Sequence, residues 1–188
     1  MELEKYTIKA QEAVKSAVDS ASRNRQQAIE PVHLLFGVIK AGENVTNFVF
    51  RKLGIEPDVI RRGVEAEITH LPRVTGGEPY LSRESNDILL AAEDLARKNG
   101  DEFVGIEAIL MAIAASKGTA AQILKDAGVT GQNLAEAVKE LRGGHKVNSQ
   151  SSEDTYQALS KYARNLVEAA RQGKLDPVIC LLYTSPSP

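Results

Sequence analysis

A helix-ending pattern occurs twice in this 188-residue sequence. In each copy an apolar helical segment runs into a glycine and then a β-branched residue, first at Leu53-Gly54-Ile55 and later at Ala127-Gly128-Val129. This pattern is typical of a helix that ends at a left-handed glycine with an apolar contact after it. The two glycines are 128 − 54 = 74 positions apart, which indicates an internal repeat.

The similarity extends upstream of the two glycines. Thr7 and Ser82 are each placed to cap a helix whose apolar residues recur at steps of three and four. Asn24 and Asn99, where these helices should end, are 99 − 24 = 75 positions apart, so one deletion explains the spacing of 74 at the glycines. Each copy is expected to hold four helices. In the fourth helix of the first copy, the residues expected to face inward are Val59, Ile60, Val64 and Ile68.

These patterns predict an all-α fold, a tandem repeat of two four-helix units packed as a pseudo-two-fold bundle. A unit of about 65 residues buries only a marginal share of its surface alone and is stabilised by packing on its twin. The junction between the two units should form a groove. The predicted segments are a double repeat domain at 1–144 (repeat one 1–72, linker 73–81, repeat two 82–144), a flexible tether at 145–153, and one further helix.

The amino-acid composition does not indicate a particular class of binding partner. The formal net charge is −2 and basic residues are scattered among acidic ones, so no strong field favours nucleic acid or an anionic membrane. The lone Cys180 excludes an internal disulfide framework. The N-terminus lacks the apolar core of a signal peptide, and no apolar run approaches ~18 residues. We therefore expect a soluble, cytoplasmic protein.

The sequence offers neither a metal site nor a catalytic set. His33, His70 and His145 have no ligand spacing between them, and His33 is expected to be a half-buried helix residue. No nucleophile, base and orienting group can be assembled. The chain also lacks a G-x-x-x-x-G-K-[ST] loop, so by itself it should neither bind a cofactor nor hydrolyse ATP.

Several motifs make the sequence resemble the N-terminal Clp repeat domain of ClpB-type AAA+ protein disaggregases. The similarity covers residues 1–179. It implies a substrate-engaging domain that binds unfolded or aggregated polypeptide and is joined to a hexameric ring. The ring would use ATP and magnesium and would cooperate with the DnaK chaperone system. The motifs are the doubled unit itself, Ile29–Leu34, Arg97–Phe103, Gly118–Gly128, Tyr156–Tyr162 and Gly173–Ile179.

The same resemblance implies a substrate-contacting patch on the domain surface at Thr7, Asp101 and Glu107. Their residue types match, and the two carboxylates could hold backbone N–H groups or cationic side chains of an unfolded peptide. An equally good interpretation is that they stabilise helix N-termini by ~0.3–1 kcal/mol, with Thr7 as a cap. The resemblance also places Leu95 and Ala108 on the wall of the groove, whereas helical spacing alone assigns them to the core.

Beyond residue 153 the resemblance implies the start of the first AAA+ domain at 154–179. Cys180–Pro188 is unlike the family and is typical of a non-native or frame-changed tail. The 188 residues would then be an incomplete reading of a full-length ATPase.

Two other functions stay open: an adaptor-docking module for folded partners, and a helix-turn-helix DNA-binding protein built around Gly128. Charge argues against DNA binding, because the segment that would enter the DNA groove holds one cation, Lys139, beside two acidic residues, Glu136 and Glu140.

Overall fold

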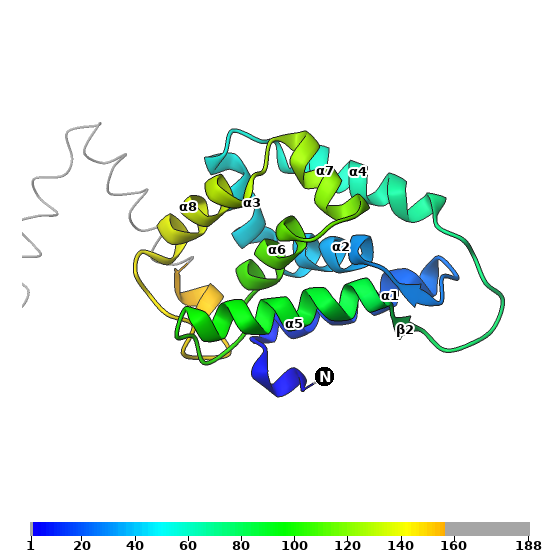
Figure 1. Cartoon of the computed structure of the whole chain (residues 1–188), viewed down its shortest axis with the longest axis horizontal. Helices are drawn as coiled ribbons and strands as arrows, with labels where there is room; N and C mark the ends of the chain where they lie inside the picture. The colour runs from blue at the N-terminus through cyan, green and yellow to red at the C-terminus, as the bar shows by residue number, and fades with distance from the viewer. Residues whose placement is uncertain (1, 157–188) are drawn as a thin grey trace, which may run out of the picture.

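The computed structural model describes residues 2–156, and over that range the chain is an all-α protein, as predicted. The predicted segments beyond residue 156, most of the start of the AAA+ domain and the tail at 180–188, lie outside the described residues. A short 3₁₀ helix (Leu3–Lys5) precedes the first repeat. The helices, in chain order, are α1 (Ile8–Arg23), α2 (Pro31–Ala41), α3 (Glu43–Lys52), α4 (Pro57–His70), α5 (Arg83–Lys98), α6 (Ile106–Ala115), α7 (Thr119–Ala127) and α8 (Gly131–Arg142) (Figure 1).

The paired helix ends that predicted the repeat are confirmed. Gly54 and Gly128 both have positive φ, 74° and 106°. After each glycine the next N–H bonds back into the helix, from Ile55 to the Phe50 carbonyl at 2.8 Å and from Val129 to the Leu124 carbonyl at 2.9 Å. The starts match as well, because the Thr7 and Ser82 side chains each accept a hydrogen bond from the backbone N–H three residues later. Local chemistry therefore builds the same four-helix unit twice.

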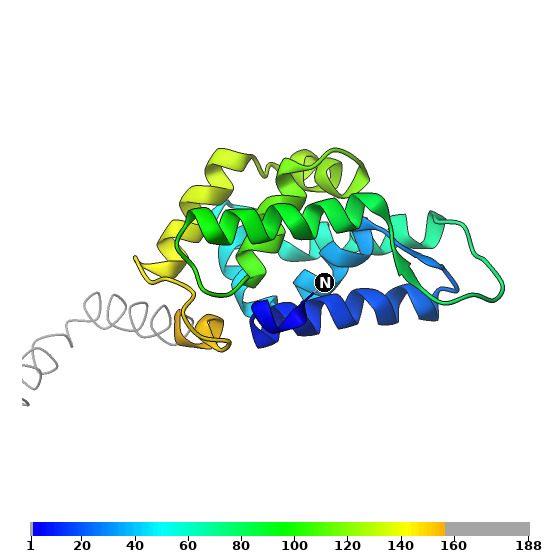
Figure 2. The same cartoon turned by 60° about the horizontal axis from the view of Figure 1, so that its bottom comes forward.

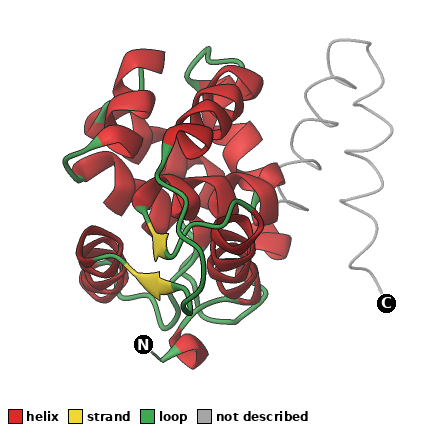
Figure 3. Ribbon diagram, turned by 90° about the vertical axis from the view of Figure 1, so that its right-hand side faces the viewer, coloured by secondary structure: helices red, strands yellow, loops and turns green. Residues whose placement is uncertain are grey.

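Two short parallel pairings, which helical periodicity could not predict, tie the repeats together. Strand β1 (Ala28–Ile29) pairs with β2 (Tyr80–Leu81), as Figure 3 shows. An isolated bridge joins Tyr6 to Val104. The two pairings are equivalent, because an offset of 75 carries Tyr6 onto Leu81 and Ile29 onto Val104. In each pairing the segment before the first helix of one repeat meets the segment before the second helix of the other, so neither repeat is complete alone.

The core lies around α2 and α6, which contact each other. Helix α1 packs on α2 and α5 packs on α6, and both outer helices run along the long axis of the molecule (Figure 2). The approach of α1 and α2 is close, because a Cβ added to Gly37 would lie only 2.0 Å from the Ala13 carbonyl oxygen. Glycine is therefore the residue that fits at position 37.

Two expectations about individual residues were wrong. Val59 was expected to face inward, but it is 56% exposed, because Ile60, Val64 and Ile68 already fill the buried face of α4. His33 was expected to be half-buried, but it is fully buried. Its Nδ1 accepts from the Glu30 N–H at 2.9 Å, and its Nε2 lies 2.7 Å from Gln26 Oε1, so the ring is held by two specific partners.

Within residues 2–156, no single helix has both the length and the apolar character needed to cross a membrane. Helices α6 and α7 meet these criteria only as a pair that is bent by 96°.

Candidate functional site

Of the three polar residues implied as a substrate patch, Asp101 and Glu107 share one cation, and Thr7 is linked to them through Glu153. Thr7 caps α1, Glu107 lies in the first turn of α6, and Asp101 lies in the loop between α5 and α6. Arg142, the last residue of α8, links the two carboxylates: its Nη1 is 3.0 Å from Asp101 Oδ2, and its Nη2 is 2.8 Å from Glu107 Oε1. A second bond from Arg142 Nε to the same Glu107 oxygen, at 3.0 Å, fixes the guanidinium plane.

A segment at the end of the described chain, residues 147–156, lies over this cluster. The Glu153 Oε1 atom accepts two hydrogen bonds, from the Thr7 hydroxyl at 2.6 Å and from the Ile106 N–H at 3.1 Å. The Tyr156 hydroxyl donates to Glu107 Oε1 at 3.1 Å. We call residues 147–156 the covering segment, and we call the group formed by Thr7, Asp101, Glu107 and Arg142 the polar cluster.

The polar cluster is buried, which differs from the expected surface patch. Thr7 and Glu107 have no exposed surface, and the side chain of Asp101 is 1% exposed. The covering segment hydrogen-bonds all three of these residues, and its packed placement differs from the flexible tether expected at 145–153. Within it Val147 and Glu153 are fully buried, although their neighbours are serines and other polar residues that are typical of a linker.

With the covering segment in place, two buried carboxylates lie close together, and the repulsion between their charges is unfavourable. Glu107 and Glu153 bring two carboxylates to one buried place: a Cβ added to Gly105 would lie 3.0–3.1 Å from the oxygens of both. One oxygen of each, Oε2, has no hydrogen-bond partner among the described residues. Burial, and then the neighbouring Glu107, raise the pKa of Glu153 to about 7. The closed site therefore favours a protonated Glu153.

Burial also raises the pKa of Tyr156, so its phenol keeps its proton and acts as the donor to Glu107.

The equivalent position in repeat one is built differently. The offset of 75 places Gln26 at the position of Asp101, and His33 at that of Ala108. Gln26 Nε2 donates to the Ile68 carbonyl near the end of α4 at 2.6 Å, and Gln26 Oε1 lies 2.7 Å from His33 Nε2. Two neutral side chains and one backbone carbonyl therefore supply one another's hydrogen bonds. Burial lowers the pKa of His33 to about 4, which keeps this network uncharged. The charges of the polar cluster are therefore specific to repeat two.

The two apolar residues implied for the groove wall lie in or against the core. Ala108 is 4% exposed on the buried face of α6. Leu95 is half-buried and packs against the core from α5.

Three members of the site were not predicted from the sequence: Arg142, Glu153 and Tyr156. The sequence gives only a weak pattern for Glu153 and Tyr156: together with Val147 and Gln150 they recur at every third position of a mostly polar segment. Arg142 has no such pattern.

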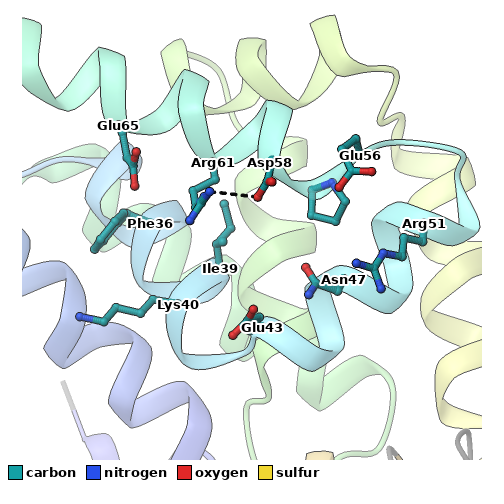
Figure 4. A pocket seen from close by; sticks show the side chains of 11 residues that line it. Phe36, Ile39, Lys40, Glu43, Asn47, Arg51, Glu56, Asp58, Arg61 and Glu65 are labelled. Carbon is teal, nitrogen blue, oxygen red and sulfur yellow. Dashed lines mark ion pairs between the residues drawn. The ribbon is translucent and has the colours of Figure 1, made fainter.

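An open pocket of about 400 Å³ lies in repeat one, between α2, α3 and α4. Phe36 and Ile39 contribute apolar lining, and three basic and four acidic side chains surround them (Figure 4). One pair within it, Arg61 and Asp58, forms an ion pair at 3.1 Å. The pocket can therefore offer both charges to a partner. No group of three or more His, Cys, Asp or Glu side chains within residues 2–156 could hold a metal ion.

Comparison with known proteins agrees with this fold. Residues 5–127 match the family described as Clp repeat (R) N-terminal domain. The chain is 56% identical over 179 residues to the chaperone protein ClpB of Bacteroides thetaiotaomicron, covering 95% of this chain and 21% of that protein. It is 51% identical over 179 residues to ClpB of Porphyromonas gingivalis, with the same two coverages of 95% and 21%. The chain thus spans about a fifth of the length of these curated relatives.

Among solved structures, the Hsp104 N-terminal domain from Candida albicans superimposes with a TM-score of 0.71 at 20% identity. The match covers 79% of this chain and 99% of that one, and it supports the fold. The family match over residues 5–127 holds the four helices of repeat one and the first three of repeat two, together with the Thr7, Asp101 and Glu107 positions. The chain therefore belongs to the Clp repeat N-terminal domain family, and the curated relatives it resembles are ClpB chaperones.

Proposed function

We propose that this chain is the substrate-engaging N-terminal domain of a ClpB-type chaperone, and that it captures unfolded or aggregated polypeptide. One observation carries the proposal: Thr7, Asp101 and Glu107 each hydrogen-bond the same stretch of polypeptide. Hydroxyl, carboxylate and guanidinium groups together can serve the donors and acceptors of a peptide. The family match over residues 5–127 supports the same role.

In this role the domain performs no chemistry of its own. It raises the local concentration of captured segments near a hexameric AAA+ ring, which would lie in the longer protein and use ATP and magnesium. Contacts with each segment need to be weak, because a domain that passes its substrates on must also release them. Cytoplasmic location and cooperation with the DnaK system belong to the same proposal, as do Leu95 and Ala108 as apolar contacts with the substrate.

A binding assay tests the proposal. The full chain is titrated into a fluorescently labelled, permanently unfolded polypeptide and, separately, into the same protein in its native fold, and anisotropy is followed. We expect binding of the unfolded form at micromolar or weaker affinity and no binding of the native form. The Arg142→Met variant, which leaves the two carboxylates of the polar cluster without their cation, should weaken binding. Equal binding of the folded and unfolded forms would contradict the proposal.

A second candidate function, docking of a folded adaptor protein, is favoured by the pocket between α2, α3 and α4. This pocket is open and carries both charges around Phe36 and Ile39, which suits a preformed surface of a partner. The Arg61→Glu variant would then abolish capture of the adaptor and leave binding of unfolded polypeptide unchanged.

DNA binding has less support. On α8 the exposed Lys139 is flanked by Glu136 and Glu140, and Glu140 is already paired with Lys52 at 2.8 Å. Tight binding to duplex DNA at low salt would overturn the preference for polypeptide.

A further inference from the structure

The covering segment is held largely through its backbone. The Val147 carbonyl accepts from the N–H groups of Glu102 and Phe103, at 2.9 and 3.2 Å, and the Val147 N–H donates to Asp101 Oδ1 at 3.0 Å. Three residues on, the Gln150 carbonyl accepts from the Ile8 N–H at 2.8 Å. Backbone contacts of this kind do not depend on which side chains the bound chain carries. The surface under the segment is therefore suited to hold polypeptide of many sequences.

Two side chains of the segment, Glu153 and Tyr156, bond the groups around the polar cluster, while Val147 is buried and Gln150 Nε2 donates to the Glu4 carbonyl at 3.3 Å. Glu153 places one acceptor oxygen on two donors, the Thr7 hydroxyl and the Ile106 N–H. Tyr156, three residues later, is 1% exposed and donates to Glu107. Between them, Asp154 and Thr155 are exposed. The chemistry recognised is thus a hydrogen-bond acceptor followed, at the third position, by an aromatic ring that carries a donor.

The polar cluster is incomplete without an occupant. If the covering segment left, the Ile106 N–H and the Thr7 hydroxyl would lose their acceptor, and Asp101 Oδ1 would lose its backbone donor. At the equivalent place in repeat one, Gln26 bonds His33 and the Ile68 carbonyl, so every partner comes from within the same repeat. In repeat two the corresponding groups instead bond residues that lie beyond the end of the repeat, where a separate polypeptide could take their place.

The present occupant is not the best one for this site. Glu153 adds a carboxylate next to Glu107, and Glu107 and Asp101 already outnumber the single cation, Arg142. A carboxamide would keep the acceptor oxygen and bring a donor in place of the second oxygen, which has no partner among the described residues. A competing segment with glutamine or asparagine at this position should therefore bind more tightly than the chain's own segment does.

We propose that residues 147–156 occupy the domain's polypeptide-binding site as an intramolecular substitute for substrate. We further propose that the site prefers segments with a carboxamide three positions before an aromatic residue. This inference rests on the proposed function, since it names the substrate class and the regulation of the same site. A substrate must displace the covering segment, whose covalent attachment gives it a high effective concentration. Capture is thereby limited to segments that are abundant or well matched, such as those on an aggregate.

The test uses the full chain and two variants, Tyr156→Ala to loosen the covering segment and Asp154→Ala as an exposed control in the same segment. The probes are a labelled peptide of residues 145–156 (HKVNSQSSEDTY), its versions with Glu153→Gln or Tyr156→Ala, and a permanently unfolded polypeptide. Hydrogen exchange of residues 147–156 and thermal unfolding show whether the segment has loosened while the domain stays folded. If Tyr156→Ala does not fold, Glu153→Ala takes its place.

We expect Tyr156→Ala to bind the peptide at least about tenfold more tightly than the unmodified chain, and Asp154→Ala to behave as the unmodified chain does. The Gln version of the peptide should bind better than the Glu version at pH 8, and the Ala version should not bind. Equal affinity of the unmodified and Tyr156→Ala chains for the unfolded polypeptide, with no binding of the peptide, would overturn the inference and leave the proposed function standing. Binding of the peptide without binding of the unfolded polypeptide would reject the proposed function instead. Failure of both probes on every folded variant would reject both.

Discussion

The Thr7 hydroxyl donates a 2.6 Å hydrogen bond to the Glu153 carboxylate across 146 positions of sequence. Thr7 also caps α1 by accepting from the Ala10 N–H at 3.1 Å, so one side chain begins the first helix and holds the end of the described chain. The bond ties the covering segment to the helix start that helped to reveal the repeat. Glu153 is therefore the residue through which the covering segment meets the start of α1.

Stability should depend on the ionisation of Glu153. Its pKa is raised to about 7 in the closed form, mainly by burial and then by Glu107, so its contribution is complete below the ordinary value of 4.5 and is lost as pH rises through about 7. The other groups that meet it are the Thr7 hydroxyl and the Ile106 N–H, and Tyr156 lies beside it. Glu153→Gln cannot ionise, so its free energy of unfolding relative to that of the unmodified chain should rise by on the order of 2–3 kcal/mol as the pH is raised from 5 to 8. Denaturant unfolding of both proteins across that range measures the gain, and parallel curves would contradict it.

Arg142 should be among the most sensitive positions of the domain. Arg142→Met leaves Asp101 and Glu107 as buried carboxylates without a cation, which typically costs about 3–5 kcal/mol. The matched control is Arg97→Met, because Arg97 pairs with Asp94 at 3.0 Å on the surface, where such pairs contribute at most about 1 kcal/mol. Chemical denaturation compares the two, and similar losses would mean that the polar cluster has little effect on stability.

His33 should stabilise the fold only in its neutral form. Because burial lowers its pKa to about 4, its contribution is complete above the ordinary value of 6.5 and is lost as pH falls towards 4. His33→Ala removes the partners of Gln26 and of the Glu30 N–H, and we expect a loss of about 2–4 kcal/mol at pH 7.5. His70 is exposed, so His70→Ala should change stability by less than about 0.5 kcal/mol. A small effect of His33→Ala at pH 7.5 would show that the network contributes little.

Gly37 should tolerate no side chain. Alanine favours a helix over glycine by up to about 1 kcal/mol, but at position 37 its Cβ would meet the Ala13 carbonyl oxygen at 2.0 Å and force α1 away from α2. We expect Gly37→Ala to destabilise the domain by about 2 kcal/mol or more. Gly131 begins α8 with nothing within 4 Å of an added Cβ, so Gly131→Ala should be neutral or slightly stabilising. Thermal unfolding of the two variants tests this, and a Gly37→Ala variant as stable as Gly131→Ala would contradict it.

Much of the fold could be predicted because it depends on interactions between residues that are close in sequence. The caps at Thr7 and Ser82, the glycines at 54 and 128, and the three- and four-residue spacing of apolar residues act over one or two helical turns. The parallel pairing of Tyr6 with Val104 joins residues 98 positions apart, and no periodicity within either repeat encodes it. Val59 shows the limit on a smaller scale, because an apolar residue at the edge of a helical stripe can face either way.

The candidate site was only partly predictable for the same reason. The resemblance supplied Thr7, Asp101 and Glu107, but their burial depends on a segment whose composition is typical of a flexible linker. Val147, Glu153 and Tyr156 are separated by polar residues that say little about packing. Their role follows from hydrogen bonds to residues about 45 or more positions away, which only a folded chain reveals.

If unfolded polypeptide binds at the polar cluster in place of the covering segment, a ¹⁵N NMR titration of the full chain with a permanently unfolded polypeptide should show it. We expect shifts at Thr7, Asp101, Ile106 and Glu107, together with signals of Glu153 and Tyr156 that move towards those of a released chain. Shifts confined to the pocket around Phe36 and Arg61, with the covering segment unchanged, would contradict it.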